Sequence, residues 1–126
     1  MANAQHLWYR ESILNDLGIA VPSTYEEVIA AAEKIKAAGV MENPYAGAFK
    51  SGWNLGQEFV NMYLGHGGEF FKSGSAQPNV NNEKGVAALN VIKKLTELSN
   101  PDFLTQDTNA VKEEWYVIDQ DNIKTC

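Results

Sequence analysis

The chain has 126 residues, of which 44% are hydrophobic and 21% are charged, and its formal net charge is −6. This length suits one compact domain, because such a domain buries roughly two-thirds of the surface that its unfolded chain exposes. The acidic balance argues against nucleic acid as a partner, since phosphate binding requires clustered Lys and Arg side chains. No apolar run approaches the roughly 20 residues of a membrane-spanning helix, so we expect no membrane insertion.

The sequence also carries no recognisable export or metal-binding motif. Its opening stretch, MANAQHLWYR, has neither the basic region nor the apolar region of a signal peptide. The single cysteine, Cys126, can form no disulfide within the chain, and no Cys or His pair has the spacing of metal ligands. We therefore predict no metal site and no cofactor.

The first 40 residues predict a short strand and two helices. Residues 7–9 (LWY) favour a strand, and a short helix follows, with Leu14 on its apolar face and Gly18 at its end. Either Ser23 or Thr24 can cap the second helix, because each has a Glu three residues later, as a capping box requires. The second helix is expected to reach about residue 38, with its buried side formed by Val28, Ala32 and Ile35.

The middle of the chain predicts a strand, a helix, a hairpin and a long helix. Residues 45–49 (YAGAF) have the composition of a short buried strand, and a helix is predicted from about residue 54 to 64. The polar segment at 71–82 predicts a hairpin, after which Asn81 or Asn82 caps the long helix. The buried face of that helix is expected to contain Val86, Leu89, Ile92 and Leu95.

A final short helix is predicted at about residues 110–115. Strands that alternate with dominant helices indicate an α/β layer arrangement, although the predicted strands are too few to complete a sheet.

No group of residues is typical of a catalyst. His66, in the loop sequence GHGG, has no nucleophile motif beside it and is interpreted as a structural or solvated histidine. Glu26 and Glu27 are adjacent, so they point to different faces of a helix, and helix capping explains them better than a catalytic pair. The sequence therefore predicts that the protein is not an enzyme.

The stretch FKSGWNLGQEF has the composition of a rim around a small ligand. A glycine beside Trp53 leaves one aromatic face exposed, and the start of the following helix offers unpaired backbone N–H groups. Asn54, Gln57 and Glu58 add amide and carboxylate groups, a mixture that suits neutral polyols such as sugars. The alternative is that Trp53 belongs to the core and the polar residues only cap and solubilise a surface helix.

The order of these motifs resembles the extracellular solute-binding proteins of the maltose-binding-protein class, the receptors of bacterial ABC sugar importers. In that class an aromatic strand leads into a helix ending in L-x-x-x-G-I, then into V-P-x-T-W/Y-x-E and a long Ala/Lys helix. The matching stretches here are 7–10 (LWYR), 13–19 (ILNDLGI) and 21–27 (VPSTYEE). A Trp-bearing loop and an N-x-E-x-G-V-x-A-L helix at 81–89 follow in the same order.

This resemblance implies a helix-dominated α/β fold that is a fragment of the second lobe of a periplasmic-binding-protein type 2 fold, with few short strands. It implies one partial domain over residues 1–126, with a hinge strand at about 7–10, the lobe body at about 11–115 and an atypical tail at 116–126. The implied function is non-catalytic: the carbohydrate-binding component of an ABC transporter, represented by one lobe. The parent protein would be periplasmic or extracellular, with a sugar and an ABC permease as partners.

In the same class, the loop and helix start of this lobe supply part of the sugar cleft. Carried over to this sequence, the implied ligand-binding set is Lys50, Ser51, Trp53, Asn54 and Glu58. Trp53 would stack on a pyranose ring, Asn54 and Glu58 would hold hydroxyl groups, and Lys50 would bind hydroxyls or an acidic sugar.

A second hypothesis comes from a different class of function. The chain would then be a free-standing truncated product that self-associates and acts as an interaction or scaffold protein without binding sugar. A lobe that is separated at its hinge exposes apolar surface and strand edges, so we expect a homo-oligomer.

Overall fold

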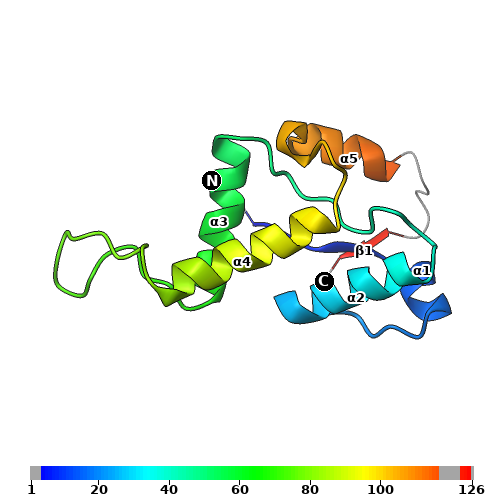
Figure 1. Cartoon of the computed structure of the whole chain (residues 1–126), viewed down its shortest axis with the longest axis horizontal. Helices are drawn as coiled ribbons and strands as arrows, with labels where there is room; N and C mark the ends of the chain where they lie inside the picture. Colours follow the sequence, from blue (N-terminus) through cyan, green and yellow to red (C-terminus); the bar gives the residue numbers. More distant parts are fainter. Residues whose placement is uncertain (1–3, 117–122, 126) are drawn as a thin grey trace.

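Helices dominate the structure, a computed structural model that describes residues 4–116 and 123–125 (Figure 1). The elements, in chain order, are β1 (Trp8–Arg10), α1 (Glu11–Asp16), α2 (Tyr25–Ala37), α3 (Trp53–Gly65), α4 (Glu83–Glu97), the 3-10 helix η1 (Phe103–Thr105), α5 (Thr108–Tyr116) and β2 (Ile123–Thr125). The predicted fold class, with few short strands among many helices, is confirmed. Most of the predicted atypical tail, residues 117–122 and 126, lies outside the described residues.

The strand predicted at residues 7–9 is confirmed one residue later, as β1. It pairs with β2 in an antiparallel register that sets Trp8 opposite Thr125 and Arg10 opposite Ile123. The two strands form a two-stranded sheet, so each keeps one edge that is not paired in this sheet.

The cap predicted for α2 is confirmed, and the structure selects Thr24 over Ser23 as the N-cap residue. Thr24 Oγ1 accepts a hydrogen bond from the backbone N–H of Glu27 at 3.2 Å, while the Glu27 carboxylate accepts from the Thr24 N–H at 3.3 Å. Ser23 donates to the same carboxylate through its backbone N–H at 2.7 Å. These bonds, first among them the one from the Ser23 N–H, hold the pKa of Glu27 below its usual range.

The strand predicted at residues 45–49 is wrong, because among the residues that the structure describes no strand pairs with this segment. The Tyr45 N–H donates to the carbonyl of Leu98, just after α4, at 3.1 Å. The Phe49 N–H donates to the Gly47 carbonyl at 2.9 Å, which bends the backbone locally. Phe49 is nevertheless fully buried, so the apolar composition reports burial rather than a strand.

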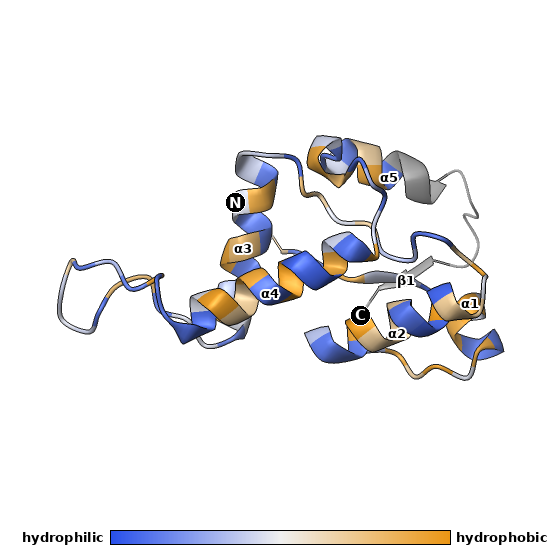
Figure 2. Cartoon of the chain, in the orientation of Figure 1, coloured by the Kyte–Doolittle hydropathy of each residue, from blue (hydrophilic) through white to orange (hydrophobic). Residues whose placement is uncertain are grey.

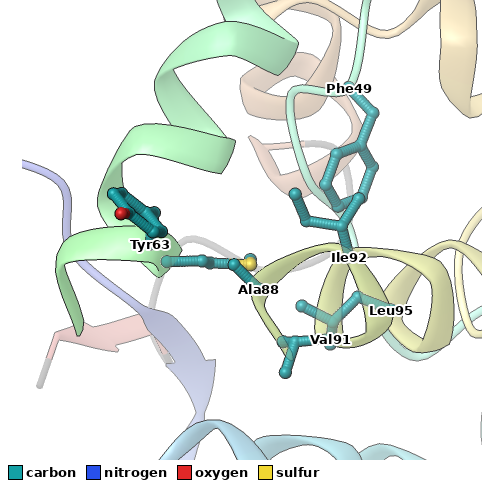
Figure 3. Packing of buried hydrophobic residues seen from close by; sticks show 7 residues of the cluster. Phe49, Tyr63, Ala88, Val91, Ile92 and Leu95 are labelled. Atoms are coloured by element: carbon teal, nitrogen blue, oxygen red, sulfur yellow. The ribbon is translucent and has the colours of Figure 1, made fainter. Parts of the chain in front are cut away.

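The core lies where α4 packs against α3 and α2. Its buried residues are Phe49, Met62, Tyr63, Ala88, Val91, Ile92 and Leu95. Figure 3 shows the Phe49 ring approaching Ile92 from the segment before α3, while the Tyr63 ring lies beside α3. The segment before α3 and the end of α3 are thus both fixed against the same helix.

The predicted buried face of α4 is wrong at Val86 and Leu89, which are both 55% exposed. The residues that α4 buries are Gly85, Ala88, Val91, Ile92 and Leu95. The small residues Gly85 and Ala88 face the core because they let neighbouring chain segments approach the helix closely. Apolar and polar colours alternate along α4 in Figure 2, so its hydropathy pattern alone did not decide between the two faces.

The predicted hairpin is confirmed as a protruding loop whose base is held by Tyr63 (Figure 1). Phe71 and Pro78 form an isolated antiparallel bridge. The Tyr63 hydroxyl lies 2.9 Å from the Glu69 carbonyl oxygen and 2.7 Å from that of Asn79. A buried tyrosine on α3 therefore joins both ends of the loop to the core.

Candidate functional site

The predicted rim lies at the start of α3, where the chain turns sharply and presents a tryptophan to solvent. Gly52 precedes the helix with φ 104°, a backbone conformation that favours glycine, and no side chain caps the helix. Trp53, the first residue of α3, is 78% exposed. The alternative in which Trp53 belongs to the core is therefore wrong. A large exposed aromatic ring at a helix start without a side-chain cap can accept a ligand from solution.

The segment that contains η1 lies alongside the loop before Trp53. The Lys50 N–H donates to the Gln106 carbonyl at 2.9 Å, and the Ser51 N–H donates to the Leu104 carbonyl at 3.4 Å. Leu104 is itself 55% exposed, so an apolar side chain and a tryptophan both reach solvent from these two backbone-paired segments. The sequence did not indicate Leu104 as part of this rim, because the pairing joins residues more than fifty positions apart.

Lys50 forms an ion pair with Asp107, whose carboxylate oxygen Oδ2 lies 3.1 Å from the lysine Nζ. The other oxygen, Oδ1, caps α5 by accepting from the N–H groups of Asn109 and Ala110, each at 3.1 Å. The Ala110 N–H, followed by Lys50, holds the pKa of Asp107 below its usual range, so Asp107 is ionised at neutral pH. The sequence contains the cap signal, an Asp just before a predicted helix, but nothing in it links Asp107 to Lys50.

Asn54 and Glu58 lie on a different side of α3 from Trp53. They are four residues apart and half-buried, so they share a face of the helix, whereas Glu58 lies about 140° around the helix from Trp53. Burial raises the pKa of Glu58, and the amide Nε2 of Gln5 approaches its Oε1 at 3.4 Å. The structure thus brings Lys50 and Ser51 beside the η1 segment and places Glu58 around the helix from them.

The charge of Glu58 affects two tyrosines. Burial raises the pKa of Tyr45, and the negative charge of Glu58 adds to this effect. Burial also raises the pKa of Tyr25, again with a smaller contribution from Glu58. Gln57, the remaining polar residue of the rim, is half-buried.

His66 has a structural position, as predicted. Its ring stacks on Tyr25 with centroids 5.6 Å apart and an interplanar angle of 3°. Its Nδ1 lies 2.7 Å from the Met62 carbonyl oxygen, which can only accept a hydrogen bond, so Nδ1 is the donor. The histidine therefore closes the C-terminal end of α3.

Two hollows on the described surface lie away from Trp53. One is a cavity of about 10 Å³ next to Tyr45 and Gln106, large enough for about one water molecule. The other is a groove of about 260 Å³, lined by Phe59, Val80, Asn81, Asn82, Gly85, Val86 and Leu89. Because its side chain is 78% exposed, Trp53 itself stands on an open face.

The described part of the chain comprises residues 4–116 and 123–125. Within these ranges, no helix is both long and apolar enough to cross a bilayer. In the same part of the chain, no three His, Cys, Asp or Glu side chains gather as a metal ion would require.

Comparison with known proteins places these features in a family. A comparison with curated protein sequences returns no match. Among solved structures, 11 chains match. One is a sugar transporter from Arthrobacter chlorophenolicus A6 with bound laminaribiose, which superposes with a TM-score of 0.72 at 24% sequence identity.

That alignment covers 94% of this chain but only 30% of the transporter chain, so the present sequence spans about a third of its neighbour's length. The likeness establishes the fold. The family description "bacterial extracellular solute-binding protein" matches residues 1–121. The chain therefore belongs to the bacterial extracellular solute-binding protein family.

Proposed function

We propose that this chain is one lobe of the carbohydrate-binding receptor of a bacterial ABC importer, and that it binds sugar without catalysing a reaction. The observation that carries this proposal is the 78% exposure of Trp53 at the uncapped start of α3. A flat aromatic face binds the C–H face of a pyranose, while nearby polar groups bind its hydroxyls. Family membership and a structural neighbour whose title names a bound disaccharide support the same conclusion.

The proposed contacts follow from where the side chains lie. Trp53 stacks on the sugar ring, and Ser51 and Lys50 reach hydroxyl groups from the loop before it. Asn54 follows Trp53 on the helix and is half-buried. Its amide group forms hydrogen bonds with the edge of a ligand that stacks on Trp53. Glu58 lies on the adjacent side of α3, where burial, together with its charge, raises the pKa values of Tyr45 and Tyr25. Its carboxylate accepts hydrogen bonds from a part of the ligand that extends around the helix.

The same proposal extends to the parent protein. We assign residues 7–10 to a hinge strand, 11–115 to the body of one lobe and 116–126 to a tail. The parent would act in the periplasm or outside the cell and deliver its sugar to an ABC permease. In receptors with two lobes, closure around the hinge buries most of the ligand surface.

A saccharide titration tests the proposal. We expect laminaribiose to bind this chain with a dissociation constant in the millimolar range, because one lobe supplies one face of a cleft and lacks closure. Ligand-observed saturation-transfer NMR detects affinities of this size. Absence of any saturation transfer to laminaribiose, cellobiose or maltose from folded protein would contradict the proposal.

We further propose that the isolated chain forms homo-oligomers. Large apolar side chains are exposed on several elements, among them Trp8 on β1, Leu64 on α3, and Val86 and Leu89 on α4. Exposed apolar surface of this extent favours self-association. Size-exclusion chromatography with light scattering should give at least twice the chain mass of 13.9 kDa, whereas a monomer at all concentrations would contradict this expectation.

A further inference from the structure

The Lys50–Asp107 ion pair leaves polar groups available to a ligand. The two side chains are 53% and 36% exposed, so solvent reaches both. An ammonium has three N–H donors, and one of them serves Asp107. The carboxylate divides its two oxygens between Lys50 and the start of α5, and Oδ2, which among the described residues accepts only from Lys50, can accept a further hydrogen bond.

The position of the pair is fixed by the backbone on both sides. The Lys50 N–H bonds to Gln106, the residue before Asp107, and the Lys50 carbonyl accepts from the Leu55 N–H of α3 at 3.2 Å. Asp107 is held in turn as the cap of α5. Lys50, in the loop that ends at Trp53, and Asp107, at the start of α5, are therefore held beside each other by their backbones.

We propose that the Lys50–Asp107 pair binds two neighbouring hydroxyl groups of an uncharged sugar and disfavours sugars that carry a carboxylate. This inference rests on the proposed function, because it assigns a ligand class to the same site. A donor and an acceptor held side by side match a vicinal diol, in which one oxygen accepts from Nζ while the other hydroxyl donates to Oδ2.

The charges around Lys50 explain why sugars with a carboxylate are disfavoured. Lys50 is the cation that the predicted rim contains, and Asp107 already neutralises it. A uronate that approached Nζ would meet the Asp107 carboxylate beside it and the net charge of −6 on the chain. Under this proposal, Lys50 takes the hydroxyl-binding role of its two predicted options.

A matched ligand pair tests this preference by NMR titration of the whole chain. Methyl β-glucoside and methyl β-glucuronide differ only at C6, and we expect the glucoside to bind about threefold more tightly. In Asp107→Asn, the side-chain oxygen can still cap α5, but Lys50 loses its charged partner. We expect this variant to bind the glucuronide about threefold more tightly than the unmodified chain does.

Two further variants complete the test. Asp102→Asn makes the same change in net charge on an exposed residue of the same segment and should leave the ratio of the two affinities unchanged. Lys50→Gln should weaken glucuronide binding relative to the unmodified chain. The Asp107 carboxylate then loses the lysine charge that offsets its repulsion of the ligand.

The affinities distinguish a failure of this inference from a failure of the proposed function. Equal affinities for both ligands, or an Asp107→Asn ratio equal to that of Asp102→Asn, would overturn the inference while leaving the proposed function intact. Failure of every saccharide to bind would instead contradict the proposed function itself.

Discussion

Gly85→Ala is expected to lower the free energy of unfolding by about 3 kcal/mol. Gly85 is buried in the first turn of α4, and a methyl group there would overlap the backbone carbonyl of Val80. The residue cannot shift away freely, because its N–H donates to the capping oxygen of Asn82 at 3.0 Å. The variant must therefore displace backbone or lose the helix cap, and both cost stability.

Gly56→Ala provides the matched control, since Gly56 also lies within a helix. A methyl group at Gly56 meets nothing within 4 Å. Alanine has the higher helix propensity, so this variant should gain up to about 1 kcal/mol. Urea denaturation followed by circular dichroism measures both changes. Equal effects of the two substitutions would show that the packing described around α4 is incorrect.

Trp53→Ala is expected to reduce saccharide affinity by at least about tenfold while changing stability little. The indole is largely exposed and contributes little to the core, so its removal should alter the free energy of unfolding by no more than about 0.5 kcal/mol. If a pyranose stacks on this ring, the variant loses the apolar face that holds the ligand. The two expected results together separate a binding role from a structural one.

Trp8→Ala serves as the control for this prediction. Trp8 is also exposed, at 53%, but it lies on β1 and outside the rim. We expect its removal to leave saccharide affinity within about twofold of the unmodified chain. The affinities are measured by the same NMR titration for all three proteins. Unchanged binding by Trp53→Ala, or an equal loss in Trp8→Ala, would contradict the stacking role.

Helix limits were predictable because their signals are local. The Thr24 cap needs only a Glu three residues later, and the Asn82 cap needs only the N–H of Gly85. These contacts lie within one helical turn, so the sequence around each helix start contains all the residues involved.

The errors arose where distant residues decide the structure. The segment at 45–49 looks like a strand, but its hydrogen-bond partners, such as Leu98, come from far along the chain. The wrong face was predicted for α4 because Val86 and Leu89 are more hydrophobic than Gly85 and Ala88. The smaller residues are buried because neighbouring segments pack closely there, which no pattern within the helix records.

The candidate site, too, could be predicted from the sequence only in part. The local sequence left open whether Trp53 is exposed or belongs to the core, and the structure exposes its ring. Asp107 was not predicted as a neighbour of Lys50, because the ion pair spans 57 positions and depends on how the η1 segment lies against the loop. Residues brought into a site by such pairing require the folded structure to be recognised.

Chemical-shift mapping tests the central claim most directly: that this lobe presents Trp53 to a sugar. In a ¹H–¹⁵N NMR spectrum of the chain titrated with laminaribiose, we expect the largest shifts at the Trp53 indole N–H and at the backbone amides of residues 50–54. Shifts confined to the groove that includes Val86 and Leu89, with the Trp53 indole unmoved at saturation, would contradict it.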